Sequence, residues 1–406
     1  MNTMIRPALL TVVFLTAITL YFQGTTNSDF LAVYLAGMSY ADGQFDQVYP
    51  AAHAVFDLSY PDSWDARAAE LGVDADTTLY PFIYPPLWAA VSSLVAPHVP
   101  LSVVSIGLPL INGALLLACS ILAWRITRTT VPVTLWLSVG FFTLVTTTYG
   151  YVALAQGQPQ ILTTFLILLA IERGRADAPL TAGACLALAA SIKLYPLVFV
   201  VIWLATRSWR AVAGFAVAGA VLAGASIALT GWPLHQDFLA QIEIISGSVL
   251  VTPLSYNFSA VVTALTEDVF ASGGGFSAAA PAALGLINKM ALVACLVAAA
   301  LAAHRATPQQ LYCGVWPLLL IAVSFFSPMS WSYHFLTALA FAPLAFATDR
   351  VTPKLCVLYL LIASSIVLAL SLSVADEATR AMILFISGVS SLAALTVALM
   401  LTRRGP

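Results

Sequence analysis

Residues 101–124 read LSVVSIGLPLINGALLLACSILAW, a run without a single charged side chain. About 20 apolar residues in a helix are enough to cross the hydrocarbon core of a bilayer. A run of this length and composition is typical of a transmembrane helix rather than of a helix on the surface of a soluble domain. This stretch therefore predicts a membrane protein.

The rest of the chain has the same character. Of its 406 residues, 61% are hydrophobic and only 8% are charged, whereas soluble domains carry about 25% charged residues. Further apolar runs lie at about 7–22, 131–151, 158–172, 178–191, 194–206, 210–230, 281–303, 311–327, 332–347, 355–373 and 381–402. They predict an all-α polytopic membrane protein, a single integral membrane domain over residues 1–406 with about 12 transmembrane helices.

Basic residues set the expected orientation. They fall at alternate ends of the runs, at Arg6, Arg125, Arg173, Arg207, Arg305, Arg350 and Arg403 among others. Because cytoplasmic loops are enriched in Lys and Arg, we expect a multi-pass protein of the cell membrane with both termini cytoplasmic. Two long loops, 23–83 and 231–280, then form a layer on the extracytoplasmic side.

Two segments of this layer carry expectations of their own. In the first loop, Leu31, Tyr34, Leu35 and Met38 recur at helical spacing, which favours an amphipathic helix on the membrane surface. The segment 84–98 is apolar but short and begins with prolines, so we expect it to be re-entrant or interfacial.

Several functional classes lack the features they require. The net charge of −2 and the scattered basic residues give no reason to expect nucleic acid as a partner. The five cysteines occur singly within or beside apolar runs, which favours packing over disulfides or metal binding. No HExxH, Walker, GxSxG or GxGxxG motif occurs in its required context.

The first candidate catalytic residue is Asp29, in the stretch Asn27-Ser28-Asp29-Phe30 at the outer end of the first apolar run. A carboxylate at this boundary stays ionisable and can still reach a substrate carried by a lipid, so we predict that Asp29 is the catalytic base. The alternative is a helix cap or a solvated loop carboxylate.

Other candidate side chains fall at the same predicted side of the membrane. Gln158 lies in an amide-rich turn. The amides could bind a hydroxyl-rich ligand, or they could form hydrogen bonds within the turn itself. Lys193 lies between two apolar runs, where it could bind phosphate or extend to the interface. Asn257 follows Ser255-Tyr256, and His334 follows Trp331, although a lone histidine is more often a packed residue.

These elements, in this order, resemble the bacterial polyprenyl-phosphate-sugar-dependent glycosyltransferases of the GT-C type. These are alpha-mannosyltransferase-like integral membrane enzymes, and the mycobacterial phosphatidylinositol-mannoside mannosyltransferase is a member. The resemblance extends over about residues 20–350. It rests on the Asp29 region, Tyr84-Pro85-Pro86-Leu87, Gly157-Gln158, Lys193-Leu194-Tyr195-Pro196, Asn257-Phe258-Ser259 and Ser327-Pro328 through His334.

The resemblance implies a GT-C-like helical bundle with an extracytoplasmic active site and a polyprenyl-phosphate sugar, commonly mannose, as donor. The acceptor would be a lipid or a glycan. We expect inverting transfer with Asp29 as base, Lys193 on the donor phosphate and His334 assisting. Tyr84, Gln158, Tyr195, Asn257 and Trp331 are expected to bind substrate.

No cofactor is required by the sequence, and a divalent metal is compatible with it but has no predicted ligands. The alternative function is a transporter or flippase of a lipid-linked or polar solute. Transporters commonly consist of two related halves with broken helices in mid-membrane. Here the polar motifs lie at one face and the halves look unrelated, which favours the transferase.

Overall fold

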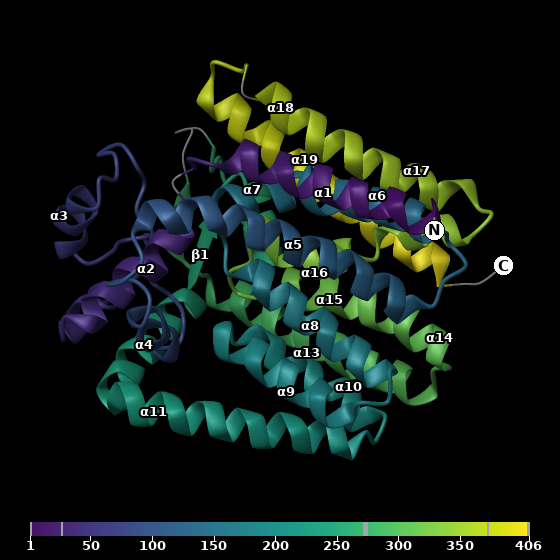
Figure 1. Cartoon of the computed structure of the whole chain (residues 1–406), viewed down its shortest axis with the longest axis horizontal. Helices are drawn as coiled ribbons and strands as arrows, with labels where there is room; N and C mark the ends of the chain where they lie inside the picture. Colours follow the sequence, from purple (N-terminus) through teal and green to yellow (C-terminus); the bar gives the residue numbers. More distant parts are fainter. Residues whose placement is uncertain (1, 26, 271–274, 372, 404–406) are drawn as a thin grey trace.

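The computed structural model describes residues 2–25, 27–270, 275–371 and 373–403. Its longer helices run roughly alongside one another, and α1 begins at the same end of the bundle at which α19 ends (Figure 1). The α-helices are α1 (Asn2–Phe22), α2 (Ser28–Ala41), α3 (Ser63–Glu70), α4 (Leu87–Ser93), α5 (Leu101–Thr127), α6 (Val133–Val145), α7 (Thr148–Ala155), α8 (Gln160–Arg175), α9 (Pro179–Ile192), α10 (Val200–Ala205), α11 (Trp209–Ser246), α12 (Phe258–Thr266), α13 (Ala282–Arg305), α14 (Pro308–Gln310), α15 (Trp316–Phe325), α16 (Leu336–Leu339), α17 (Val351–Leu361), α18 (Val367–Ser371) and α19 (Glu377–Thr402).

Short 3-10 and π-helical segments and two strands complete the described structure. The segments are η1 (Phe45–Gln47), η2 (Tyr195–Phe199), η3 (Leu311–Val315), η4 (Ser332–Phe335), η5 (Ala342–Ala347) and η6 (Ile362–Ile366). Strands β1 (Ser248–Val251) and β2 (Phe276–Ala279) pair in antiparallel fashion, with Ser248 opposite Ala279.

Within the described residues, six helical stretches are long and apolar enough to cross a membrane. They are α5, α11, α13, Pro308–Phe325, Val351–Ser371 and α19; the pair α6–α7, bent by 63°, would make a seventh. The structure is thus that of a helical membrane protein, but the predicted count of about 12 spans is not confirmed.

The difference has a physical cause. Three of the predicted runs form apolar helices of 10–17 residues, at Pro179–Ile192, Tyr195–Ala205 and Ser332–Ala347. The residues of the last of these are almost all buried by protein, with Leu339 and Phe341 fully enclosed. Hydropathy does not distinguish a side chain that faces lipid from one that faces another helix, so a short buried helix resembles a span in the sequence.

Close helix contacts hold the bundle together. Where α9 passes α11, a Cβ added at Gly183 would lie 2.2 Å from the Ala211 carbonyl oxygen. One added at Gly214 would lie 2.4 Å from the Leu180 oxygen. The missing side chains therefore let the two backbones approach each other. Further along, Gly231 takes φ 72° and ψ 165°, which kinks α11 just before Pro233.

The two long loops predicted from the sequence are largely structured. Helices α2, α3 and α4 and strand β1 lie at the end of the bundle opposite the first residues of α1 (Figure 1). We call α2–α4 with the β1–β2 hairpin the loop layer. Helix α4 has only 7 residues and is too short to cross a bilayer.

The predicted helix in the first loop exists as α2, but its apolar face does not rest on the membrane surface. Leu31 and Leu35 are fully buried, and α2 packs against α4 so closely that a Cβ on Gly37 would meet the Ser92 hydroxyl at 2.5 Å. The apolar spacing that suggested lipid contact thus serves a contact between two protein helices, and α2 is fixed in place.

Candidate active site

A cavity of about 220 Å³ lies where the loop layer meets the bundle. Its wall is assembled from segments far apart in the sequence: the start of α2, the stretch before α4, the α7–α8 turn, the end of α9 and the η4 segment. Seven of the eight predicted site residues line it: Asp29, Tyr84, Gln158, Lys193, Tyr195, Trp331 and His334. The structure thus brings together most of the side chains selected from the sequence.

Asp29 lies in the first turn of α2, whose N-cap residue is Asn27 in a left-handed conformation. The backbone amides of Asp29 and Phe30 donate to the Gln156 carbonyl oxygen at 3.1 and 3.2 Å. The Asp29 side chain is turned to the cavity, and its Oδ2 accepts a hydrogen bond of 2.7 Å from Gln158 Nε2. Asp29 is therefore neither the N-cap of α2 nor a fully solvated carboxylate.

The α7–α8 turn needs glycine at its centre. Gly157 has φ +60°, and a Cβ there would lie 2.6 Å from Leu108 Cδ2 and 3.0 Å from Asn27 Cβ. Only a residue without a side chain combines this conformation with such close packing against α5 and the N-cap of α2. The turn therefore holds Gln158 against the carboxylate of Asp29.

Gln158 is almost completely buried and uses both ends of its amide within the protein. Its Nε2 donates to Asp29, and its Oε1 accepts from the Tyr84 hydroxyl at 3.0 Å. This chain of hydrogen bonds occupies one oxygen of the Asp29 carboxylate and orients the other. Gln158 was expected to bind substrate, whereas these contacts suit it to position Asp29.

Lys193 follows the last residue of α9 and lies between two aromatic rings. Its Nζ is 5.5 Å from the centre of the Tyr84 ring and 5.1 Å from that of Tyr333, distances at which a cation is attracted to a ring face. Among the described residues, the ion pairs do not include Lys193 or Asp29. The ammonium group therefore borders the cavity without a carboxylate bound to it.

Burial and mutual attraction tune these two groups. Burial raises the pKa of Asp29 to about 6, although the Lys193 charge and the Gln158 hydrogen bond work in the opposite direction. Burial lowers the pKa of Lys193 to about 8, against the attraction of Asp29. Between these values the cavity holds a carboxylate that can accept a proton and a cation that can meet an anion.

His334 lies in η4, and its imidazole is oriented by the backbone. Its Nδ1 lies 3.1 Å from the Trp331 amide nitrogen and 3.3 Å from the Trp331 carbonyl oxygen, and the tautomer decides whether Nδ1 accepts from the first or donates to the second. The backbone at Trp331 is itself fixed by an isolated β-bridge to Ser255, and the Ser332 N–H donates to the Leu254 oxygen at 2.7 Å. The second loop thus supports the wall that carries Trp331 and His334.

Two of the predicted site residues, Asn257 and Tyr195, form hydrogen bonds within the protein. Asn257 is outside the cavity lining: it is the N-cap of α12, its Oδ1 accepts from Ala260 N–H at 2.9 Å, and it is 1% exposed. Tyr195 does line the cavity, and its hydroxyl accepts a hydrogen bond of 2.7 Å from Gln160 Nε2. Asn257 supports the wall from behind rather than facing the cavity.

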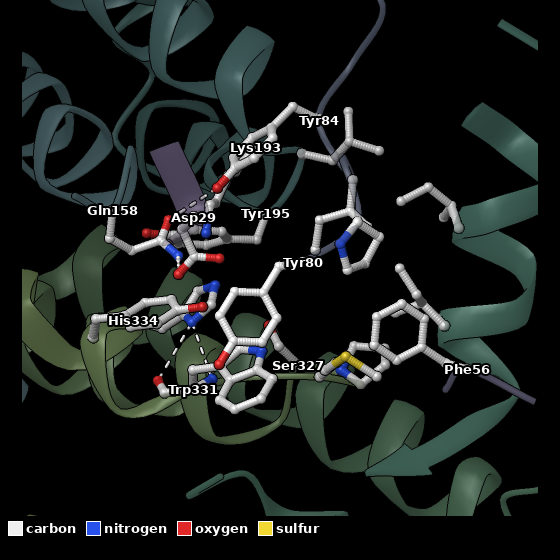
Figure 2. A pocket seen from close by; sticks show the side chains of 18 of the residues that line it. Asp29, Phe56, Tyr80, Tyr84, Gln158, Lys193, Tyr195, Ser327, Trp331 and His334 are labelled. Atoms are coloured by element: carbon white, nitrogen blue, oxygen red, sulfur yellow. Dashed lines mark hydrogen bonds between the residues drawn. The ribbon is translucent and has the colours of Figure 1, made fainter. Parts of the chain in front are cut away.

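The cavity has a polar and an apolar side. Figure 2 shows Asp29, Gln158, Lys193 and His334 gathered at one side and Phe56 at the other. The apolar side is completed by side chains from α11 and neighbouring loops, namely Phe238, Ile242, Ile245, Ile83 and Met329. A ligand with an ionic or hydroxylated part joined to a hydrocarbon part fits this division.

Sequence reasoning missed Tyr80, Tyr333 and Phe56. Tyr80 lies near enough to Asp29 for the carboxylate to raise its pKa, after the larger effect of burial. Tyr80 lies shortly before Tyr84 in the same proline-containing stretch, and Tyr333 is next to His334 in the sequence. Nearness in sequence to a predicted site residue was therefore the signal that could have indicated both. Nothing in the sequence indicated Phe56.

No grouping of three or more His, Cys, Asp or Glu side chains suited to a metal ion occurs in the described part of the chain. The charge available to meet an anion in this cavity is that of Lys193.

The fold and the cavity together define a membrane-embedded protein that presents a carboxylate and an ammonium group to an amphiphilic ligand. Residues 82–329, more than half of the chain, match the family model of glycosyltransferase family 87, and the chain belongs to that family. No curated protein matches the chain. The family is one of glycosyltransferases, so the predicted activity class is confirmed, and the family gives no support to a transporter.

Asp29 precedes the matched region, and Trp331 and His334 follow it. Tyr84, Gln158 and Lys193 are inside it. The roles of the individual residues therefore rest on the geometry of the cavity rather than on the family match.

Proposed function

We propose that the protein transfers a hexose, mannose in the simplest case, from a polyprenyl-phosphate donor to a hydroxyl group of a lipid or glycan acceptor. The observation that carries this proposal is the cavity in which Asp29 and Lys193 border the same space. A glycosyl transfer needs a group that removes the acceptor proton and a group that stabilises the departing phosphate.

A lipid-linked phosphate donor accounts for both sides of the cavity. Lys193 lies at the polar side without a bound carboxylate, which leaves its charge available to a phosphate. Phe56, Phe238 and Ile242 supply apolar contacts for the first part of a hydrocarbon chain. The choice of mannose rests on the resemblance of the ordered sequence motifs to mannosyltransferase-like enzymes.

The reaction proceeds as one displacement with inversion. The acceptor oxygen attacks the anomeric carbon while Asp29 takes the proton from that oxygen, so that a new C–O bond forms. The bond between the anomeric carbon and the phosphate oxygen breaks, and its electron pair leaves with the polyprenyl phosphate. Gln158 holds Oδ2 of Asp29, which leaves Oδ1 to accept the proton.

The negative charge that develops on the leaving phosphate meets two groups. Lys193 neutralises it, and His334 donates a hydrogen bond from Nε2 in the tautomer in which Nδ1 accepts the Trp331 N–H. Tyr84, Tyr195 and Trp331 border the same cavity and would contact sugar or acceptor. The loop layer would face the extracytoplasmic side, with membrane lipids around the bundle.

The direct test supplies purified protein with radiolabelled polyprenyl-phosphate mannose and a membrane lipid extract. We expect labelled product from the parent protein and none above background from the Asp29→Asn variant. Transfer from a nucleotide-linked mannose but not from the polyprenyl-linked one would overturn the proposed donor, and failure of every lipid-linked hexose would overturn the proposed function.

A further inference from the structure

Gln160, the first residue of α8, is completely buried behind the wall of the candidate active site and is outside the cavity lining. Its Nε2 lies 2.7 Å from the hydroxyl oxygen of Tyr195 and 3.3 Å from that of Thr164. Because hydroxyl groups both donate and accept, this contact holds Tyr195 whichever end of the amide faces it. Gln160 is thus bound to a residue that does border the cavity.

The Tyr195 hydroxyl has a second partner in the side chain of Thr337, three residues after His334. Thr337 also donates to the Thr164 hydroxyl at 3.3 Å. We call Gln160, Thr164 and Thr337 the anchor of Tyr195. All three are at most 2% exposed, so their hydrogen bonds are shielded from solvent and fix the hydroxyl firmly.

Stability alone does not explain a glutamine at this position. Gln160 Oε1 is buried and has no hydrogen-bond partner among the described residues. An unpaired buried amide oxygen destabilises a folded protein, and an apolar side chain of the same length would remove that cost. The amide is therefore better explained by what it holds than by what it adds to the core.

The ring of Tyr195 in turn contacts the imidazole of His334. The two ring centres are 5.7 Å apart and the ring planes are inclined by 64°, an edge-to-face arrangement. The ring of Tyr333 lies 5.0 Å from the same imidazole. Since Nδ1 is held by the Trp331 backbone, these two aromatic rings limit how far the imidazole can turn about that contact.

The same α7–α8 turn also supports Asp29. The Gln160 N–H and the Tyr84 hydroxyl both donate to Gln158 Oε1, at 3.3 and 3.0 Å. They leave Gln158 Nε2 directed to the carboxylate of Asp29. The backbone of Gln160 thus supports the carboxylate, and its side chain supports Tyr195.

We infer that Gln160 is a positioning residue of the reaction: its side chain holds Tyr195 against His334 and so directs the imidazole to the phosphate of the donor. This inference rests on the proposed function, in which His334 assists the departing phosphate. Because that assistance grows as charge develops, its loss should lower kcat and leave the KM for donor nearly unchanged. Replacing the side chain keeps the Gln160 N–H, so the contacts of Asp29 remain.

The first test does not depend on transfer. The chain has five histidines, and in histidine-labelled protein the imidazole C–H signals of His334 are identified by their absence in His334→Gln. These signals respond to the aromatic ring beside them, so we expect Gln160→Met to shift them. The matched control is Thr163→Val, because Thr163 is equally buried on the same helix and also loses one hydrogen bond, to the Pro159 oxygen. The control should leave the signals unchanged.

The melting temperature in detergent separates positioning from a purely structural role. Gln160→Met removes the unpaired oxygen and keeps the length of the side chain, so it should melt no lower than the parent. A variant that melts lower and leaves the His334 signals in place would overturn the inference. If Gln160→Met does not fold, Thr337→Val removes the other partner of the same hydroxyl and should shift the same signals.

A transfer assay measures the consequence for the reaction. We expect Gln160→Met to lower kcat by about tenfold, as for one weakened hydrogen bond to a charged group, and Thr163→Val to transfer at the parent rate. Tyr195→Phe lacks the anchored hydroxyl, so adding Gln160→Met to it should lower kcat no further.

The outcomes distinguish the inference from the proposed function. Independent, additive effects of Gln160→Met and Tyr195→Phe, or His334 signals that do not move in Gln160→Met, would overturn the inference and leave the proposed function intact. Absence of transfer by the parent from every lipid-linked hexose would overturn the proposed function. Shifted His334 signals would then still establish that Gln160 holds Tyr195 against the imidazole.

Discussion

Asp29 shows how a single residue acquires a chemical role from its neighbours. Its Oδ2 is held at 2.7 Å by Gln158, which is in turn held at 3.0 Å by the hydroxyl of Tyr84. Fixing one oxygen orients the carboxylate without supplying it with a full counter-charge, because Lys193 does not form an ion pair with it. Burial raises the pKa of Asp29 to about 6, against the Lys193 charge and the Gln158 hydrogen bond, and this keeps the group both ionised and basic near neutral pH.

Replacing Asp29 by Asn tests its role as the base. The variant keeps the shape of the side chain and can still contact Gln158, but it cannot take up the acceptor proton. We expect turnover to fall by roughly 10² to 10⁴-fold while donor binding is retained, measured as transfer per folded molecule in detergent. Asp76→Asn is the matched control and should transfer at the parent rate. An Asp29→Asn protein that folds, binds donor and transfers at a parental rate would disprove the assignment.

The pH dependence of the reaction tests Asp29 and Lys193 together. Asp29 has to be ionised, so activity should rise as the pH passes about 6, and Lys193 has to be charged, so activity should fall as the pH passes about 8. In Lys193→Arg the guanidinium stays charged throughout this range, so the alkaline fall should disappear while the acidic rise remains. The measurement is the pH profile of kcat/KM for donor, scaled to each protein's maximum; an unchanged alkaline limb in Lys193→Arg would contradict the role of Lys193.

The sequence indicated Asp29 and Lys193 because a charged side chain at the edge of an apolar run is costly and therefore conspicuous. It could not indicate that Gln158 holds Asp29, since the two residues are brought together only by the packing of the α7–α8 turn on α2. Tyr80 and Phe56 were missed for the same reason. An aromatic residue in an apolar chain carries no signal until its neighbours in space are known.

At the scale of elements, the apolar runs predicted most helices but not their environments. The run at 101–124 became α5, and the run at 210–230 became the first part of α11, which then continues past its kink to Ser246. The run at 332–347 became a buried series of short segments, since its side chains contact protein on all sides. An apolar run thus predicted helical residues in each of these cases, but it did not show whether lipid or protein surrounds them.

The contact between α9 and α11 gives a prediction at this scale. In Gly183→Ala the new methyl group would meet the backbone of α11 at 2.2 Å, so the helices must separate, and overpacking of this kind costs about 1–3 kcal/mol. We expect a lower melting temperature in detergent and weaker donor binding, because Lys193 lies just beyond the end of α9. The control is Gly219→Ala on α11, where a Cβ would meet nothing within 4 Å, and it should melt like the parent. Equal melting of the two variants would show that the close helix contact is not needed.

At the scale of the whole molecule, the helices place all of the proposed chemistry at one end. The loop layer lies opposite the end at which α1 begins and α19 ends (Figure 1). The cavity with Asp29 is lined by residues of this layer, among them the start of α2. The ion pairs of Glu172 with Arg125 and Arg173, at 2.7 and 2.5 Å, lie near the ends of α5 and α8 away from the cavity. A separation of acidic loops from arginine-bearing helix ends is the pattern expected of a protein inserted with its arginines inside.

This arrangement predicts the topology of the protein in its membrane. In a variant whose five cysteines are replaced, a single cysteine at Asp62→Cys should react with a membrane-impermeant maleimide in intact cells, because the proposed topology places the loop layer outside the cell. A cysteine at Arg207→Cys, in the turn between α10 and α11, should react only after the cells are opened, since that turn carries the basic residues expected inside. Both positions are in turns or at helix ends, where the maleimide can reach them. Labelling of each cysteine after detergent is added is the control, because it shows that poor access within the folded protein does not explain a missing label in intact cells. Labelling at position 207 but not at position 62 in intact cells would place the Asp29 cavity on the cytoplasmic side. That result would contradict the proposed topology, because the donor would then have to present its sugar on the cytoplasmic side of the membrane.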